Sequence, residues 1–222
     1  MKIQKPNTSF QIVAHRGLSQ KYPENTLEGF KAVLMQHIDM LEIDVHFTKD
    51  KQLVVIHDDS IDRTSNQKGK VKDFTLEELK QFDFGIKHGE SFKNTCISTF
   101  SEVLSLFKKY SKTLLIEIKK PEQYPGIEKA LLEELDKFQI PSHRVVIQSF
   151  DVESVKKMSE YTKKYALGVL ISKKQYWYKQ PDYENIASFA QFINPNYKLI
   201  NKKFIKRAHE HHLKVIPYTV NN

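Results

Sequence analysis

Three carboxylate side chains are spaced so that two neighbouring strands can bring them together. Glu42 and Asp44 lie two residues apart in LEIDV, and Glu117 lies two residues before Lys119 in LLIEIKK. Residues two apart in a strand share one face, so each of these pairs points in one direction. Three clustered carboxylates are unfavourable unless a hard cation binds among them, and Ca²⁺ or Mg²⁺ prefers such oxygen ligands. We expect a divalent cation at these acids; for Glu117 the alternative is a plain ion pair with Lys119.

Two histidines and an arginine accompany these acids. His15 ends the apolar run IVAH, His57 ends LVVIH, and Arg16 directly follows the first histidine. Histidine titrates near neutral pH, and bond cleavage by acid–base catalysis needs such groups on opposite sides of the scissile bond. Arg16 offers a fork of donors for two phosphate oxygens, and Lys119 adds a second positive charge. With a cation they would neutralise a phosphodiester and its transition state. Zinc is disfavoured, although the two histidines could ligate it.

Apolar strands that alternate with amphipathic helices would position these groups. Seven segments fit strands of this kind: IVAHRG, MLEIDV, TLLIEIK, VVIQSF, ALGVLI, FINPNY and VIPYTV. Such alternation predicts parallel strands joined by right-handed helical crossovers. A strand covered by helices on both faces should be apolar on both, whereas a closed barrel can direct charged side chains inward. The polar faces of LEIDV and LLIEIKK therefore favour a (β/α)8 TIM barrel over an open sheet.

The segment LVVIHD departs from this alternation. Residues 48–51 are too few for a helix, so LVVIHD is expected to pair antiparallel with the preceding strand. We expect one catalytic barrel domain over residues 1–222, with a small insertion at about 46–95 after the second strand. The last βα unit is expected to be missing from this chain. Predicted helix caps are Asn25, Thr75, Thr99 and Asp151; for Asn25, contact with the site is the alternative.

Composition narrows the class of protein. The chain has 35 Lys and Arg against 27 Asp and Glu, a net charge of +8, but the lysines are scattered over helix faces, so nucleic-acid binding is disfavoured. The single cysteine, Cys96, excludes an internal disulfide, and we expect it to be buried. No segment reaches the roughly 18 apolar residues of a membrane span, and the apolar run near the N-terminus is shorter than we expect of a signal peptide. We expect a cytoplasmic protein without stable membrane insertion; the oligomeric state stays open.

An ordered set of motifs from residue 12 to residue 221 resembles the glycerophosphodiester phosphodiesterase family, whose barrels are of the phosphatidylinositol-phospholipase-C-like type. The motifs are HRG, PENT, EIDV with Thr48 and Asp50, HD at 57–58, DRTS with Gly69, IEIK, QSF and TVN. No single short motif carries the resemblance; their order along the chain does.

The resemblance implies a metal-dependent hydrolase that releases glycerol 3-phosphate and an alcohol from a small-molecule glycerophosphodiester. His15 and His57 become the acid/base pair, and Arg16 and Lys119 the phosphate clamp. Glu42, Asp44 and Glu117 become the ligands of the divalent cation, Ca²⁺ or Mg²⁺. Further substrate-binding positions are Gln148, Phe150 and Tyr218.

Two other functions compete with this interpretation. A phospholipase-D-like lipid phosphodiesterase would share the paired histidines and the acidic set, but it would be expected to be secreted and disulfide-bonded. A truncated, inactive barrel would bind phosphodiesters without cleaving them. The preferred alcohol, the native metal and the route of hydrolysis, direct or through a cyclic phosphate, are left open by the sequence.

Overall fold

The computed structural model describes residues 11–220, so Asn221 of the TVN motif lies outside the described residues. The chain divides into two compact units, one up to Val145 and one from Val146, and each is described by itself. The first unit contains these strands and helices: β1 (Val13–His15), α1 (Leu27–Leu34), β2 (Met40–Phe47), β3 (Leu53–Val55), α2 (Leu76–Lys80), β4 (Ser98–Thr99), α3 (Phe100–Phe107), β5 (Thr113–Ile118) and α4 (Ile127–Lys137).

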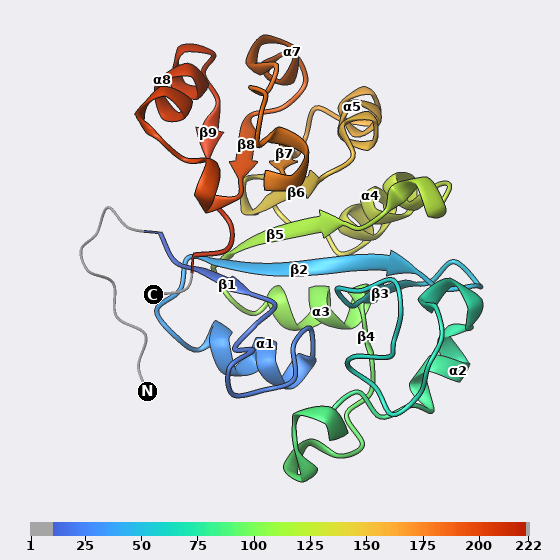
Figure 1. Cartoon of the computed structure of the whole chain (residues 1–222). Helices are drawn as coiled ribbons and strands as arrows, with labels where there is room; N and C mark the ends of the chain where they lie inside the picture. The colour runs from blue at the N-terminus through green and yellow to red at the C-terminus, as the bar shows by residue number, and fades with distance from the viewer. Residues whose placement is uncertain (1–10, 221–222) are drawn as a thin grey trace. The chain divides into compact units, whose positions relative to one another are not determined.

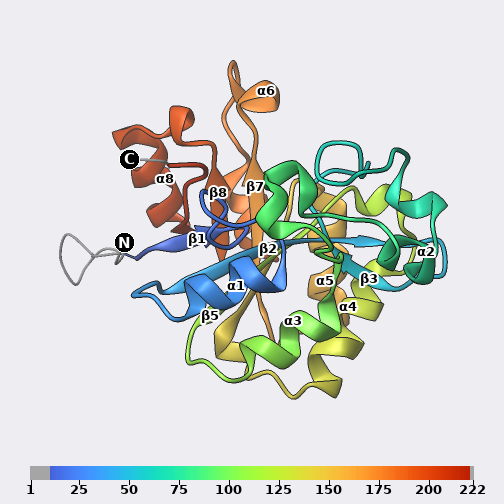
Figure 2. The ribbon, with the colours of Figure 1, turned by 90° about the horizontal axis from the view of Figure 1, so that it is seen from below.

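Strand β2 is the centre of the first unit's sheet. It pairs parallel with β1 and β5 and antiparallel with β3, which pairs antiparallel with β4. Helices α1 and α3 cover one face of this sheet (Figures 1 and 2). The predicted antiparallel pairing of LVVIHD with the preceding strand is therefore confirmed.

All eight residues of β2 are buried, although the strand carries two acids and a histidine. Alternation along the strand puts apolar Ile43 and Val45 on one face and Glu42, Asp44 and His46 on the other. Ile43 and Val45 are both 0% exposed, and the two acids are buried as well: Asp44 is 0% exposed and Glu42 is 4% exposed. The acids are thus held in a low-dielectric environment, where charge is costly unless it has a partner.

Local capping chemistry explains where the helices begin. Thr75 and Thr99 form capping boxes at α2 and α3, as their spacing to a glutamate three residues later predicts. The prediction for α1 is wrong by one residue, since Thr26 is the cap and its hydroxyl accepts from the Gly29 N–H. Asn25 instead adopts the left-handed conformation with φ 56°, which frees its side chain for another role.

Residues 60–93 fold around a small apolar cluster against β3. Buried Val54 and Ile56 contact a set contributed mainly by this segment: Ile61, Val71, Leu79, Phe84 and Ile97. Phe74 and Phe82 pack edge-on at the border of the cluster, with ring centroids 5.3 Å apart. The segment is therefore anchored by its own core. That residues 1–222 form a single domain with an insertion at about 46–95 stays a prediction.

The second unit continues the alternation of strands and helices. Its elements are β6 (Val145–Ser149), α5 (Val152–Tyr161), β7 (Ala166–Ile171), α6 (Lys173–Tyr176), α7 (Tyr183–Ala187), β8 (Phe192–Pro195), α8 (Lys202–Glu210) and β9 (Lys214–Val215). The four strands pair in parallel in this order. Asp151 caps α5 as predicted, because its side chain accepts from the Ser154 N–H at 2.9 Å.

Two further observations concern the predictions made from the amino-acid composition. Cys96 is exposed, so its predicted burial is wrong: it lies in the loop before β4, with Sγ 3.5 Å from the Lys80 carbonyl oxygen. Within residues 11–220, no helix has the length and apolar character that crossing a membrane requires.

Candidate active site

The three predicted acids meet where β2 and β5 lie side by side. Asp44 is the register partner of Glu117, and Glu42 lies two residues earlier on the same face of β2. Carboxylate oxygens of the three residues all lie within 4.8 Å of one another, and all three side chains are buried. We call this set the acidic cluster.

Positive groups border the acidic cluster on two sides. Lys119 Nζ lies 2.7 Å from Glu117 Oε1 and 3.7 Å from Asp44 Oδ1. Arg16 Nε lies 3.4 Å from Asp44 Oδ2, and the Arg16 backbone N–H donates to Glu42 Oε2 at 3.0 Å. Arg16 follows β1 in the left-handed conformation, φ 60°, which turns its backbone toward Glu42. Two cations thus face three carboxylates.

Burial and mutual repulsion shift the pKa values of the acidic cluster. Burial, followed by the charges of Asp44 and Glu117, raises the pKa of Glu42 well above its usual range. Burial and the Asp44 charge raise the pKa of Glu117 to about 7. Burial alone would lower the pKa of Lys119, but the charges of Glu117 and Asp44 outweigh it and raise that pKa. The cluster therefore favours the binding of further positive charge.

The cluster also offers the donor atoms that a hard cation needs. Asn25 Nδ2 donates to Asp44 Oδ2 at 3.0 Å and orients that carboxylate. Asp44 Oδ1 and Asn25 Oδ1 are buried without a hydrogen-bond partner in the described part of the chain. Three carboxylates with oxygens within 4.8 Å of one another suit Mg²⁺ or Ca²⁺, whereas zinc favours nitrogen and sulfur donors.

Both predicted histidines lie in the same unit as the cluster, and both are partly exposed. His15 is the register partner of Glu42, and its Nε2 lies 4.0 Å from Glu42 Oε2. Burial, then the Arg16 charge, lowers the pKa of His15 to about 4; burial also lowers the pKa of His57. Both imidazoles are therefore mainly neutral at pH 7. Their side chains keep 37% and 28% exposure, which leaves them accessible to a ligand.

Asp58 fixes the orientation of His57. His57 Nδ1 lies 2.6 Å from Asp58 Oδ1, so the ionised carboxylate accepts the Nδ1 proton and leaves Nε2 as the basic nitrogen. Burial would raise the pKa of Asp58, but hydrogen bonds from Arg63 and His57 outweigh it and lower that pKa to about 2. Asp58 is therefore a fixed negative charge behind His57.

Arg63 connects Asp58 with Glu24 through hydrogen bonds. Sequence reasoning missed this residue. Its Nε donates to Asp58 Oδ2 at 2.6 Å, while its other two nitrogens donate to both carboxylate oxygens of Glu24 at 2.7 and 2.8 Å. Glu24 also accepts from Arg16 at 3.2 Å. The available signals were the motifs PENT and DRTS, which carry Glu24 and Arg63 but reveal no contact between them.

His46 is a second residue that sequence reasoning missed. It follows Glu42 and Asp44 at a spacing of two and is 0% exposed. Its Nε2 lies 3.1 Å from the His57 carbonyl oxygen, and its Nδ1 lies 2.9 Å from the Tyr124 hydroxyl. A carbonyl only accepts, so Nε2 carries the proton and Nδ1 accepts from Tyr124. The i, i+2, i+4 spacing was the signal that could have identified His46.

The remaining predicted residues lie in the second unit. Buried Gln148 accepts through Oε1 from Asn194 Nδ2 at 2.7 Å. Phe150 and Tyr218 pack edge-on with ring centroids 5.5 Å apart, and the Tyr218 hydroxyl donates to the Ile171 carbonyl at 3.1 Å. Phe150 and Tyr218 are thus brought into contact. Their role and that of Gln148 in binding substrate stay predictions.

The chain is similar in sequence to known proteins over most of its length. The glycerophosphoryl diester phosphodiesterase family matches residues 15–222. A glycerophosphodiester phosphodiesterase of Caldanaerobacter subterraneus subsp. tengcongensis is 38% identical over 95% of this chain and 85% of its own length. A glycerophosphodiester phosphodiesterase of Bacillus subtilis is 34% identical over 95% of this chain and 76% of its own length.

Solved structures show the same fold. A phosphodiesterase of Oleispira antarctica, in complex with the product sn-glycerol-3-phosphate, superposes with a TM-score of 0.85 at 25% identity, covering 96% of this chain and 85% of that one. A glycerophosphodiester phosphodiesterase of Thermotoga maritima gives a TM-score of 0.75 at 27% identity, covering 96% and 87%. The predicted fold class, an α/β protein of the (β/α)8 barrel type, is confirmed.

Proposed function

This chain belongs to the glycerophosphoryl diester phosphodiesterase family, and on that premise we propose that it hydrolyses glycerophosphodiesters to glycerol 3-phosphate and an alcohol with a divalent cation at the acidic cluster. The observation that carries the proposal is the convergence of Glu42, Asp44 and Glu117 within 4.8 Å beside a histidine. We infer that the small-molecule diester binds in the first unit, which contains the acidic cluster.

Arg16 and Lys119 are the proposed phosphate clamp. Their charged groups lie 3.4 and 3.7 Å from Asp44, and their side chains are only 18% and 14% exposed. A guanidinium and an ammonium held at low exposure interact more strongly with a phosphate oxygen than they would in water. Glu24 orients Arg16 through a 3.2 Å hydrogen bond, which limits the directions in which the guanidinium can point.

The three acids of the cluster are the proposed ligands of the cation, with Ca²⁺ or Mg²⁺ as the expected ions. Asn25 holds one oxygen of Asp44, and the other, Oδ1, accepts no hydrogen bond in the described part of the chain and lies 3.7 Å from Lys119 Nζ. When bound, a divalent cation would polarise a phosphoryl oxygen and offset the charge that develops on it.

His15 and His57 are the proposed acid/base pair. One neutral imidazole takes the proton of the attacking hydroxyl. The other, which is also mainly neutral at pH 7, must first take up a proton and then gives it to the oxygen of the departing alcohol. Asp58 supports His57 in either role, because its carboxylate holds Nδ1–H and stabilises the imidazolium form. The attacking oxygen belongs either to water or to the neighbouring glycerol hydroxyl, which would form a cyclic phosphate that water then opens.

The test is release of glycerol 3-phosphate from glycerophosphocholine by the purified protein, with EDTA and after addition of Mg²⁺ or Ca²⁺. We expect activity that EDTA abolishes and one of the ions restores. No glycerol 3-phosphate from metal-supplied protein would refute the proposal and favour a phosphodiester-binding barrel. Cleavage of a lysophospholipid alone would favour the lipid phosphodiesterase. A cytoplasmic location stays a prediction.

A further inference from the structure

The segment between β7 and α7 carries aromatic side chains that water surrounds. Ser172 caps the short helix α6, and Trp177 and Tyr178 follow it with 71% and 69% of their surfaces exposed. The two rings pack edge-on against each other, with centroids 5.2 Å apart and an interplanar angle of 72°. Figure 2 shows α6 at the end of a hairpin that projects beyond the strand β7. We call residues 172–179 the aromatic tip.

Lysines lie within and beside the aromatic tip. Lys173 and Lys174 are exposed on α6, and Lys179 Nζ lies 5.0 Å from the centre of the Tyr176 ring. The 3-10 helix η6 (Tyr197–Leu199) contacts α6 and adds an exposed tyrosine with Lys198 Nζ 5.7 Å from its ring centre. Neither residues 172–180 nor residues 196–203 contain an aspartate or glutamate. The tip is thus aromatic and purely basic.

From this composition we propose that the aromatic tip docks the protein on an anionic phospholipid surface. Trp and Tyr have an apolar ring with a polar edge, which suits them to the head-group region of a bilayer. Lysines near an anionic leaflet each add attraction, while their carbon chains cover apolar surface. Docking of this kind needs no membrane-spanning helix, and it does not depend on the proposed hydrolysis.

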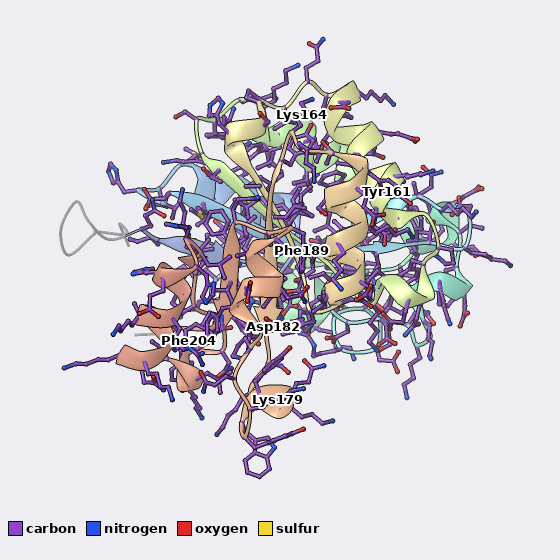
Figure 3. The ribbon with its side chains drawn as sticks, turned by 90° about the horizontal axis from the view of Figure 1, so that it is seen from above. Tyr161, Lys164, Lys179, Asp182, Phe189 and Phe204 are labelled. Carbon is purple, nitrogen blue, oxygen red and sulfur yellow. The ribbon has the colours of Figure 1, made fainter. Side chains whose placement is uncertain are left out.

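The geometry favours a bilayer over other polyanions. Sites for single-stranded nucleic acid combine a basic groove with a row of stacking rings along it. Here Trp177 and Tyr178 lie edge-on at the end of a projecting hairpin, a convex arrangement that inserts into a surface more readily than it tracks a strand. Figure 3 shows Lys179 on the same projecting hairpin.

Trp177 is the only tryptophan in the chain, so its fluorescence reports the tip alone. We would titrate the protein with vesicles of phosphatidylcholine and with vesicles that also contain phosphatidylglycerol. The expected result is a blue shift of the emission, and quenching by brominated acyl chains, only with the anionic vesicles, reversed by salt. Unchanged emission with the anionic vesicles would overturn the proposal, and a response to single-stranded oligonucleotides instead would assign the tip to nucleic acid.

Sedimentation with the same vesicles tests individual residues. Lys174→Gln should weaken binding about fivefold and Trp177→Ala at least about tenfold. Tyr161→Ala is the matched control, since Tyr161 is 40% exposed on α5 and lies away from the tip (Figure 3). Equal binding by Trp177→Ala and the control would overturn the proposal. Hydrolysis of water-soluble glycerophosphocholine should be unchanged in all three variants, so failure of docking and failure of the proposed function are distinguishable.

Discussion

Replacing Glu117 by glutamine should make the metal-free protein more stable while it removes activity. Glu117 is 7% exposed, and its carboxylate meets Asp44 and Glu42 within 4.8 Å. Glutamine has nearly the same shape but carries no charge, so it mimics the protonated acid. The like-charge repulsion that a cation would relieve is then absent from the folded state.

The magnitude follows from the pKa of Glu117. Burial and the Asp44 charge raise it from 4.5 to about 7, which at about 1.4 kcal/mol per unit corresponds to about 3 kcal/mol. The folded protein holds this proton more tightly than the unfolded chain does. Between pH 4.5 and pH 7 the folded state therefore binds more protons, and the free energy of unfolding falls as the pH rises. Above pH 7 the full loss is present.

Urea unfolding in EDTA at a series of pH values from 5 to 8 measures this effect. At pH 8, Glu117→Gln should be more stable than the wild type by up to about 3 kcal/mol, and the difference should fall below about 1 kcal/mol at pH 5. Mg²⁺ or Ca²⁺ should stabilise the wild type more than the variant, because binding to the folded state adds stability. Glu133→Gln, at an exposed position of α4, is the control and should show neither effect.

A variant that is less stable than the wild type at pH 8 in EDTA would refute this reasoning. That result would mean that the ion pair with Lys119, 2.7 Å from Glu117 Oε1, outweighs the repulsion within the cluster. The cluster would then be a satisfied structural network rather than a site prepared for a cation.

Three further variants test the rest of the site. His57→Ala should abolish turnover at an unchanged melting temperature. His37→Ala replaces an exposed histidine and is the control, which should stay active. Turnover of His57→Ala near the wild-type rate would contradict the acid/base role. Arg63→Gln should lower kcat roughly tenfold to a hundredfold, and Arg63→Lys should restore part of it. An unchanged kcat would show that the contacts of Arg63 with Asp58 and Glu24 serve stability only. Tyr124→Phe should lower the free energy of unfolding by about 1–3 kcal/mol in urea, because it leaves buried His46 Nδ1 without a donor, and no loss would contradict the tautomer assigned here.

Much of the fold follows from interactions between residues close in the chain. The capping boxes at Thr75 and Thr99 depend on a glutamate three residues later, and the hairpin of β2 and β3 follows from a connection too short for a helix. The shared face of Glu42 and Asp44 is likewise a property of one strand. These features could be predicted because their partners lie within a few positions.

The sequence did not predict the role of a side chain that can make either of two local contacts, or the burial of side chains in loops. Asn25 and Thr26 can both cap α1, and the structure uses Thr26 while Asn25 donates to Asp44, 19 positions away. The exposure of Cys96 depends on how its loop lies before β4, which no local pattern reports. The exposure of Trp177 also depends on the tertiary structure, because an aromatic residue in a loop is buried only if another segment packs over it.

Sequence alone determined the chemistry available to this protein: three acids at strand spacing, two histidines at the ends of apolar runs, and an arginine beside the first. Only the tertiary structure decided which groups surround them. Arg63 meets Glu24 across 39 positions, and His46 meets Tyr124 across 78. Such contacts depend on how strands and loops distant in the chain come together, and the low dielectric of the buried sheet then sets the pKa values of the acids and histidines there.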